Sequence, residues 1–277
     1  MGGGKNAYQS VVEELKVLQT LSHPNIIWLN EIIDDPKKDD IYLVTEWLSK
    51  GSLHDLVEER NQGRTTRIGL PISVVRTYLS DMIKALDYCH NVAGVFHRDI
   101  KPENIMLNHN DEAILIDFGV SALKKGNDAV LKNKIGTLLY FAPEMFQSTG
   151  EDFKVRGDFI DLWALGVTFF YLITGQHPFN AGNFFDLKQK VLEEEINFGL
   201  IKHEASRVLL QKMLEKDPNK RAKLEDLIND PWVTSKGALN LMEVDYSRED
   251  EANFGNISRK VTQQFQSNRN LFAPDLF

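Results

Sequence analysis

The chain has 277 residues, of which 42% are hydrophobic, with a single cysteine and a formal net charge of −8. This length and apolar content suffice for a buried core in one large domain or two small ones. The acidic balance argues against a nucleic-acid partner, because such binding is driven by Lys and Arg side chains that neutralise phosphates. The longest apolar run, residues 162–173, is too short to cross a membrane. One cysteine cannot form an intramolecular disulfide, so we expect a reducing, cytoplasmic environment.

The first 48 residues predict one helix and a hairpin. Residues 8–21 carry apolar side chains at helical spacing. His23 stands before Pro24 and ends this helix, because a residue that precedes proline is pushed out of helical geometry. Residues 26–33 and 41–48 are β-rich runs on either side of a polar turn, which predicts an antiparallel pair.

The next stretch predicts two helices joined by a surface loop. The first helix begins at residues 51–53, and the loop spans 61–70. Ser73 is a suitable N-cap for a second helix over residues 74–91, whose apolar positions repeat on one face. This pattern indicates core packing and no binding site.

Residues 95–144 carry the chemistry, in the strings VFHRDIKPENIMLN, LIDFG and GTLLYFAPE. Asp99 can accept or orient a hydroxyl proton, and Lys101 is a cation two residues away. Asp117 and Asn104 offer the hard oxygen ligands that a divalent cation prefers. Phosphoryl transfer needs mainly such positioning and charge neutralisation. A lone Asp in a loop is usually a turn former. The hypothesis of phosphoryl transfer therefore rests on the spacing of all four residues and not on Asp99 alone.

These strings resemble the protein kinases: HRDIKPEN matches their catalytic loop, DFG at 117–119 their metal-binding motif, and APE at 142–144 the end of their activation segment. A Lys two residues after the catalytic Asp is typical of the serine/threonine kinases. The resemblance implies an α+β, protein-kinase-like fold, with an incomplete β-rich small lobe and a mainly helical large lobe. It also implies phosphoryl transfer from Mg²⁺-ATP to a Ser or Thr hydroxyl of a protein substrate.

The resemblance assigns further residues to the nucleotide site. Backbone groups near Glu46 and Leu48 would hold the adenine edge, Thr45 matches the gatekeeper, and Met106 matches the floor of the adenine pocket. A second set has structural or regulatory roles in the family, and His97 packs there against the Phe of DFG. This second set consists of Glu14, Arg98, Phe118, Thr137, Glu144, Asp161 and Arg221. Glu144 would pair with Arg221, Asp161 would accept backbone N–H groups near His97 and Arg98, and Glu14 would match the ion-pairing glutamate of the regulatory helix.

The C-terminal half predicts mainly helices. An apolar helix spans residues 158–174, and two short strands surround the turn at residues 108–111. Further helical patterns cover 183–195, 204–216 and 222–229. We expect three regions: a partial small lobe at 1–48, the large lobe at 49–234 and a tail at 235–277.

Longer stretches such as EIIDDPKKDDIYLVTE and GTLLYFAPEMF make the chain most similar to the calcium/calmodulin-dependent protein kinase kinases. Upstream members of the related energy-sensing cascade and yeast-like or protist calcium/calmodulin-dependent kinases are alternatives. The tail residues 254–277 place apolar side chains at helical spacing among basic ones, as calmodulin targets do. A frayed tail, or a helix packed on the large lobe, is the plainer interpretation.

The main departure from the family pattern lies at the N-terminus. Only seven residues precede Tyr8, and they contain neither a Gly-rich loop nor a V-A-I-K-like strand lysine. We expect an N-terminally truncated kinase or a degenerate one. The alternative function is therefore a catalytically inactive, kinase-like module that binds and positions a partner.

Overall fold

The computed structural model describes residues 14–34, 41–124, 130–131, 134–147 and 154–235. Its centre is α5 (Gly157–Thr174), almost every residue of which is buried. Apolar side chains occur all around this helix, so it needs cover on every side. Among the described residues it is the one helix long and apolar enough to cross a membrane, yet 83% of it is buried inside the fold. That is the behaviour of a core helix.

Two helices pack beside this core. In α2 (Leu53–Asn61), Ser52 caps the first turn through a reciprocal pair of hydrogen bonds with Asp55. The second helix, α3 (Ile72–Asp87), starts two residues before the predicted first residue, with Pro71 at its N-cap and no side-chain cap. The prediction of Ser73 as N-cap was wrong, because proline fixes φ at a value close to the helical one and lets the helix start directly after it.

The predicted helix 74–91 also changes character at its end. Its last residues form a π-helical turn, η1 (Tyr88–Ala93), which Gly94 closes in the left-handed conformation at φ 65°. Such turns often lie at functional positions. Here the wide turn directs His90 inward, and it is buried.

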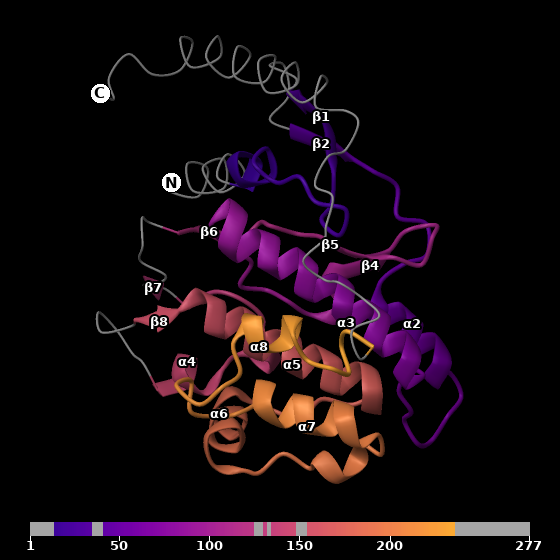
Figure 1. Cartoon of the computed structure of the whole chain (residues 1–277), viewed down its shortest axis with the longest axis vertical. Helices are drawn as coiled ribbons and strands as arrows, with labels where there is room; N and C mark the ends of the chain where they lie inside the picture. The colour runs from indigo at the N-terminus through magenta and orange to yellow at the C-terminus, as the bar shows by residue number, and fades with distance from the viewer. Residues whose placement is uncertain (1–13, 35–40, 125–129, 132–133, 148–153, 236–277) are drawn as a thin grey trace.

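The remaining helices follow the predicted patterns with tighter bounds. Below α5 in Figure 1 lie α4, α6 and α7, and α8 packs beside α3. The helices are α4 (Pro143–Gln147), α6 (Phe184–Glu193), α7 (Glu204–Met213) and α8 (Leu224–Ile228). Short 3₁₀ turns are η2 (Pro102–Asn104), η3 (Leu138–Tyr140) and η5 (Phe198–Leu200).

The described strands form four two-stranded antiparallel ribbons. The predicted hairpin is present as β1 and β2, although residues 26–28 and 46–48 lie outside the strands. The two strands around the turn at residues 108–111 are β4 and β5. The pairs are β1 (Leu29–Asp34) with β2 (Ile41–Thr45), β3 (Val95–Phe96) with β6 (Ala122–Leu123), β4 (Ile105–Leu107) with β5 (Ala113–Leu115), and β7 (Val130–Leu131) with β8 (Val155–Arg156).

The molecule has an upper part and a lower part (Figure 1). The upper part consists of β1, β2 and the helical residues 14–18, which are the described portion of the predicted helix 8–21. Backbone bonds join it to β5, since Ile27 N donates to Leu115 O at 3.0 Å and Leu115 N donates to Asn25 O at 2.9 Å. One hydrophobic core runs through both parts. The expected α+β class is confirmed.

Candidate functional site

The loop that carries Asp99 is fixed from below by one buried carboxylate. Asp161, on α5, has no exposed surface and accepts hydrogen bonds from His97 N at 2.9 Å and Arg98 N at 2.7 Å. These are the contacts that the sequence predicted. His90 Nε2 lies 2.8 Å from the same carboxylate, a partner that the sequence analysis missed because nothing near His90 in the chain points to residue 161. A buried carboxylate needs such partners, and here they hold the loop rigid.

The carboxylate of Asp99 is surrounded by donors. Its Oδ1 accepts from Thr137 N at 2.9 Å and Thr137 Oγ1 at 2.7 Å, and its Oδ2 accepts from Lys101 Nζ at 2.6 Å and Asn104 Nδ2 at 3.0 Å. Burial raises the pKa of Asp99, but the hydrogen bonds from Lys101 and Thr137 more than compensate, and the pKa lies below its ordinary value. Asp99 is therefore ionised at neutral pH.

Thr137 reaches Asp99 because the chain passes very close to the catalytic loop just before it. Gly136 has φ +125°, and a Cβ at this position would lie 2.5 Å from the carbonyl oxygen of Arg98. Only glycine tolerates both this backbone conformation and this approach. The loop of residues 95–107 and the segment ending at residue 144 thus form one site.

Asn104 and Asp117 lie on adjoining backbone segments. Ile116 N donates to Asn104 O at 2.9 Å, which brings the DFG turn against the catalytic loop. The amide nitrogen of Asn104 is occupied by Asp99 O and Oδ2, so its Oδ1 remains an acceptor. Asp117 is exposed, with a left-handed backbone at φ 61° and Gly119 N donating to its Oδ1 at 3.2 Å. Within the described ranges no group of three or more His, Cys, Asp or Glu side chains is assembled for a metal. A Mg²⁺ ion at this position would need phosphate and water oxygens as further ligands, which is its usual coordination in proteins.

His97 and Phe118 form a buried aromatic pair, with ring centroids 4.8 Å apart and nearly perpendicular planes. His97 Nε2 is 2.9 Å from Ile116 O. Burial lowers the pKa of His97 despite the carboxylates nearby, so the ring is neutral and donates to that carbonyl. This pair ties DFG to the catalytic loop.

In the family that the sequence resembles, the Arg before the catalytic Asp is neutralised by a phosphate or another anion on the activation segment; Arg98 has other partners here. Its guanidinium is buried, with Nε donating to Val120 O at 2.5 Å and Nη2 donating to Ser121 O at 3.5 Å. Burial lowers its pKa, although Asp161 acts in the opposite direction. In this structure Arg98 thus holds the backbone just after DFG. Asp128, expected to supply an anion to Arg98, lies outside the described residues.

Glu144 and Arg221 form the expected pair far apart in sequence. Two guanidinium nitrogens of Arg221 donate to the two carboxylate oxygens at 2.7 and 2.9 Å. The Arg221 side chain has no exposed surface, lies 4.9 Å from the Trp163 ring and also donates to Phe159 O at 3.1 Å. This bidentate geometry is the strong form of an ion pair, and it anchors the start of α4.

The upper wall of the site is formed by Glu14. Its carboxylate and that of Asp117 both lie around Gly119, where an added Cβ would meet Asp117 Oδ1 at 3.1 Å and Glu14 Oε2 at 3.4 Å. Burial raises the pKa of Glu14, and the charge of Asp117 raises it further. No ion pair to Glu14 is formed within the described part of the chain.

The residues predicted to hold adenine lie at the end of β2, just after it, or on β4. Thr45 is exposed, and its Oγ1 donates to Glu46 O at 3.3 Å. Glu46 N donates to Trp28 O at 3.1 Å. Leu48 is buried and Met106 is half-buried on β4. They lie along one connection between the upper and lower parts.

The sequence analysis also missed a polar cluster below the site. Tyr140 Oη lies 2.9 Å from His177 Nε2, and the rings of His177 and Tyr171 are 4.9 Å apart. Tyr171 Oη donates to Glu58 Oε1 at 2.7 Å. The cluster joins η3, which follows Thr137, to α5 and α2. Its members come from α2, η3 and the end of α5 with the loop after it, and no local sequence motif indicates that they meet.

Comparisons with known proteins agree with this geometry. The family described as the protein kinase domain matches residues 3–233. The chain is 36% identical over 233 residues to the serine/threonine-protein kinase ssp1 of Schizosaccharomyces pombe, covering 81% of this chain and 34% of that protein. It is 31% identical to the serine/threonine-protein kinase ppk34 of the same yeast, covering 86% of this chain and 64% of that protein. It is 33% identical to the CBL-interacting serine/threonine-protein kinase 20 of Arabidopsis thaliana, covering 80% of this chain and 48% of that protein. The chain thus spans less than two thirds of the length of each of these relatives.

Proposed function

Because the chain belongs to the protein kinase family, we propose that it takes part in transfer of the terminal phosphoryl group of ATP to a Ser or Thr hydroxyl of a protein substrate. The observation that carries this proposal is the Asp99 carboxylate, ionised and held by Lys101, Asn104 and Thr137. A carboxylate fixed in this way can orient a hydroxyl for attack. Serine/threonine-protein kinases among the relatives support the same class of substrate.

The roles divide among few side chains. Asp99 orients the substrate hydroxyl, and Lys101 neutralises charge on the phosphate that is transferred. Asp117 and Asn104 Oδ1 would hold Mg²⁺, which would supply neutralisation of the phosphate charge. Thr137 keeps the substrate-binding segment against Asp99.

For the nucleotide base we propose the connection after β2. Backbone groups of Glu46 and Leu48 hold the adenine edge, Thr45 borders the space behind it, and Met106 supports the ring from below. Leu48 and Met106 already belong to or pack against the hydrophobic core, which favours an apolar base on this surface.

Polypeptide 1–277 should transfer phosphate poorly. Loss of one preorganised donor to developing charge typically costs about 10²- to 10³-fold in rate, and the printed sequence has neither a Gly-rich loop nor a strand Lys near Glu14. Weak binding of Mg²⁺-ATP should survive through Asp117 and Asn104. The alternative, an inactive kinase-like binding module, predicts no nucleotide binding at all.

The test combines calorimetry and turnover. Calorimetric titration with Mg²⁺-ATP should give a weak signal that Asp117→Asn abolishes, while the exposed control Asp111→Asn retains it. Labelled ATP and a generic Ser/Thr substrate should give turnover close to background in wild type and in Asp99→Asn. Robust turnover that Asp99→Asn abolishes would overturn the low-activity part of the proposal, and absence of any nucleotide binding would favour the binding module.

Kinase activation should not depend on phosphorylation within residues 120–135. Ser121 is the one hydroxyl between Gly119 and Gly136, and its Oγ already donates to Phe118 O at 2.7 Å, which occupies it as a turn residue. Phosphopeptide mapping in which a phosphate on Ser121 tracks activity would contradict this.

We also propose membership of the calcium/calmodulin-dependent protein kinase kinase group, with calmodulin as a partner of residues 254–277 and a cytoplasmic location. The support is the sequence pattern of these residues, which lie outside the described ranges. A peptide of residues 254–277 titrated with calcium-loaded calmodulin should bind at micromolar concentration. Absence of binding there would remove calmodulin from the proposal.

A further inference from the structure

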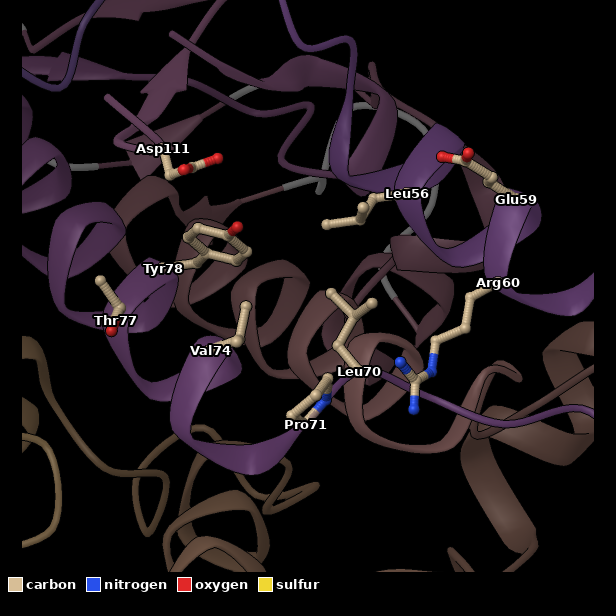
Figure 2. Close-up of a pocket in the computed structure, with 9 residues that line it drawn as sticks. All are labelled: Leu56, Glu59, Arg60, Leu70, Pro71, Val74, Thr77, Tyr78 and Asp111. Carbon is tan, nitrogen blue, oxygen red and sulfur yellow. The ribbon is translucent and has the colours of Figure 1, made fainter. Parts of the chain in front are cut away.

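A groove in the lower part has no role in the proposed phosphoryl transfer. It has a volume of about 540 Å³ and lies between α2, the start of α3 and the turn after β4. None of the catalytic or nucleotide residues predicted from the sequence lines it. Figure 2 shows that the side chains of Leu56, Leu70 and Val74 point toward one another across the space. This volume is within the range of real binding sites.

The hydroxyl of Tyr78 is a polar group that faces the groove. Tyr78 forms one side, is only 5% exposed, and directs its hydroxyl into the space (Figure 2). Within the described residues this hydroxyl makes no hydrogen bond, although a buried hydroxyl normally has a partner. An occupant that brings a backbone carbonyl to this position would satisfy it.

The rim of the groove carries charges of both signs, and its positive side, at Arg60, favours a carboxylate. Asp111 is neutralised by Lys50, with Nζ 2.7 Å from Oδ1. Glu59 and Arg60 leave α2 in different directions, and the guanidinium of Arg60 lies beside Leu70 and Pro71 (Figure 2). Arg60 has no ion pair within the described part of the chain.

The described chain ends close to this groove. Ser235 lines a second cavity together with Ile72, Ser73 and Arg76 of α3. The groove uses the adjoining face of the same helix, at Val74, Thr77 and Tyr78. A helix with its side chains is about 10 Å across, so the tail leaves the fold within one helix diameter of the groove.

The tail has a segment of matching chemistry at the right distance. Five extended residues, 236–240, reach up to about 17 Å, enough to pass around α3. In the next six residues, Met242, Val244 and Tyr246 alternate with Glu243 and Asp245. In an extended chain this alternation puts the apolar side chains on one face and the carboxylates on the other.

We propose that residues 241–246 of this chain bind in the groove between α2 and α3, with the apolar side chains against Leu56, Leu70 and Val74 and the carboxylates toward Arg60. Tethering favours this occupant over a free peptide, because a short linker keeps the segment at an effective millimolar concentration. The contact is independent of phosphoryl transfer and of the more distant residues 254–277.

Disulfide trapping in the full chain tests the contact. Thr77→Cys with Val244→Cys places one thiol at the groove and one on the segment, and the control pairs Val244→Cys with Thr66→Cys. Both threonines are exposed, and Cys89 is fully buried, which raises its thiol pKa and keeps it unreactive. Under mild oxidation the Thr77 pair should close at least about tenfold faster than the control pair, as quantified by peptide mass mapping.

A charge reversal sharpens the result. Arg60→Glu should slow closure of the Thr77 pair about two- to fivefold, as expected for an exposed ion pair, whereas Lys212→Glu on α7 should leave it unchanged. Circular dichroism should show the same melting temperature for both cysteine pairs. Equal closure rates for the two pairs would overturn the proposal. So would a disulfide between two chains whose rate rises with protein concentration, because the occupant would then be a second copy.

Discussion

Two carboxylates beside the site, Asp161 below it and Glu14 above it, have opposite surroundings. Asp161 accepts two backbone N–H groups and contacts His90, all within 2.9 Å. Glu14 instead lies near the carboxylate of Asp117, and its pKa is raised by burial and by that charge. The charge of Asp161 is therefore satisfied by hydrogen-bond donors of the fold, whereas Glu14 lies beside a like charge and has no ion pair within the described ranges.

The β1–β2 ribbon gathers several exposed apolar side chains. Ile33, Tyr42 and Val44 on the ribbon are large apolar side chains that are exposed, and Trp47 just after it is 86% exposed. Within the described ranges nothing covers these side chains, and a two-stranded ribbon gains little stability by itself and offers a free edge. We conclude that folding stability resides mainly in the helical part, and that the upper part depends on cover.

The largest effect should come from Asp161→Ala. The change leaves two buried N–H groups and His90 without an acceptor, at about 1–3 kcal/mol for each unsatisfied group. We expect a loss of about 4 kcal/mol or more in the free energy of unfolding, measured by urea denaturation. The control is Asp158→Ala on the same helix, whose exposed pair with Arg156 should contribute no more than about 1 kcal/mol. Similar losses of unfolding free energy in both variants would show that the buried contacts of Asp161 contribute no more than an exposed ion pair.

Glu144→Ala should have the second largest effect on the free energy of unfolding. The change leaves the buried guanidinium of Arg221 without its carboxylate partner, and breaking such a pair costs about 3 kcal/mol or more. Replacing both partners with apolar residues, Glu144→Leu with Arg221→Met, should recover most of this loss in the same urea experiment. A double variant no more stable than the single one would show that the other Arg221 contacts, including that to Phe159 O, dominate.

Asp81 gives a smaller effect that depends on pH. It lies on α3 with Ala113 N donating to Oδ2, Lys84 Nζ 3.7 Å away and Glu112 nearby, and burial raises its pKa to about 6. The unfolded chain releases this proton near pH 4, so the folded state binds more protons between pH 4 and 6. Stability should therefore fall as pH rises through this window.

Asp81→Asn cannot ionise and keeps the acceptor for Ala113 N. Relative to wild type, the variant should gain about 2–3 kcal/mol in unfolding free energy between pH 4 and pH 7. Parallel urea titrations at the two pH values measure it. Identical pH dependence in both proteins would show that Asp81 ionises with an ordinary pKa.

Glu14→Gln should have the smallest effect. Because the raised pKa means that the fold disfavours the charged form, the neutral amide should stabilise the chain at pH 7, but only by about 0.5 kcal/mol or less at this half-exposed position. Glu31→Gln on β1, an exposed carboxylate, serves as the control and should change nothing measurable. A loss above about 1 kcal/mol would reveal a cation partner for Glu14 and remove the contrast with Asp161.

The sequence by itself determined the protein kinase family and the class of fold. HRDIKPEN, DFG and APE place Asp99, Lys101, Asn104 and Asp117 at short fixed spacings, so a local string was enough to find them. The helical periodicity located α5, α6 and α7 to within a few residues, since each buries one face or all of its surface.

Tertiary structure decided how these residues are held. Thr137 reaches Asp99 across 38 positions and His90 reaches Asp161 across 71, and no local pattern encodes such distances. The start of α3 at Ile72, the π-helical turn after it and the groove at Tyr78 likewise depend on neighbours distant in sequence. Local strings specify which groups are present, whereas the packing of remote segments against α5 and the catalytic loop sets where those groups point and which charges find partners.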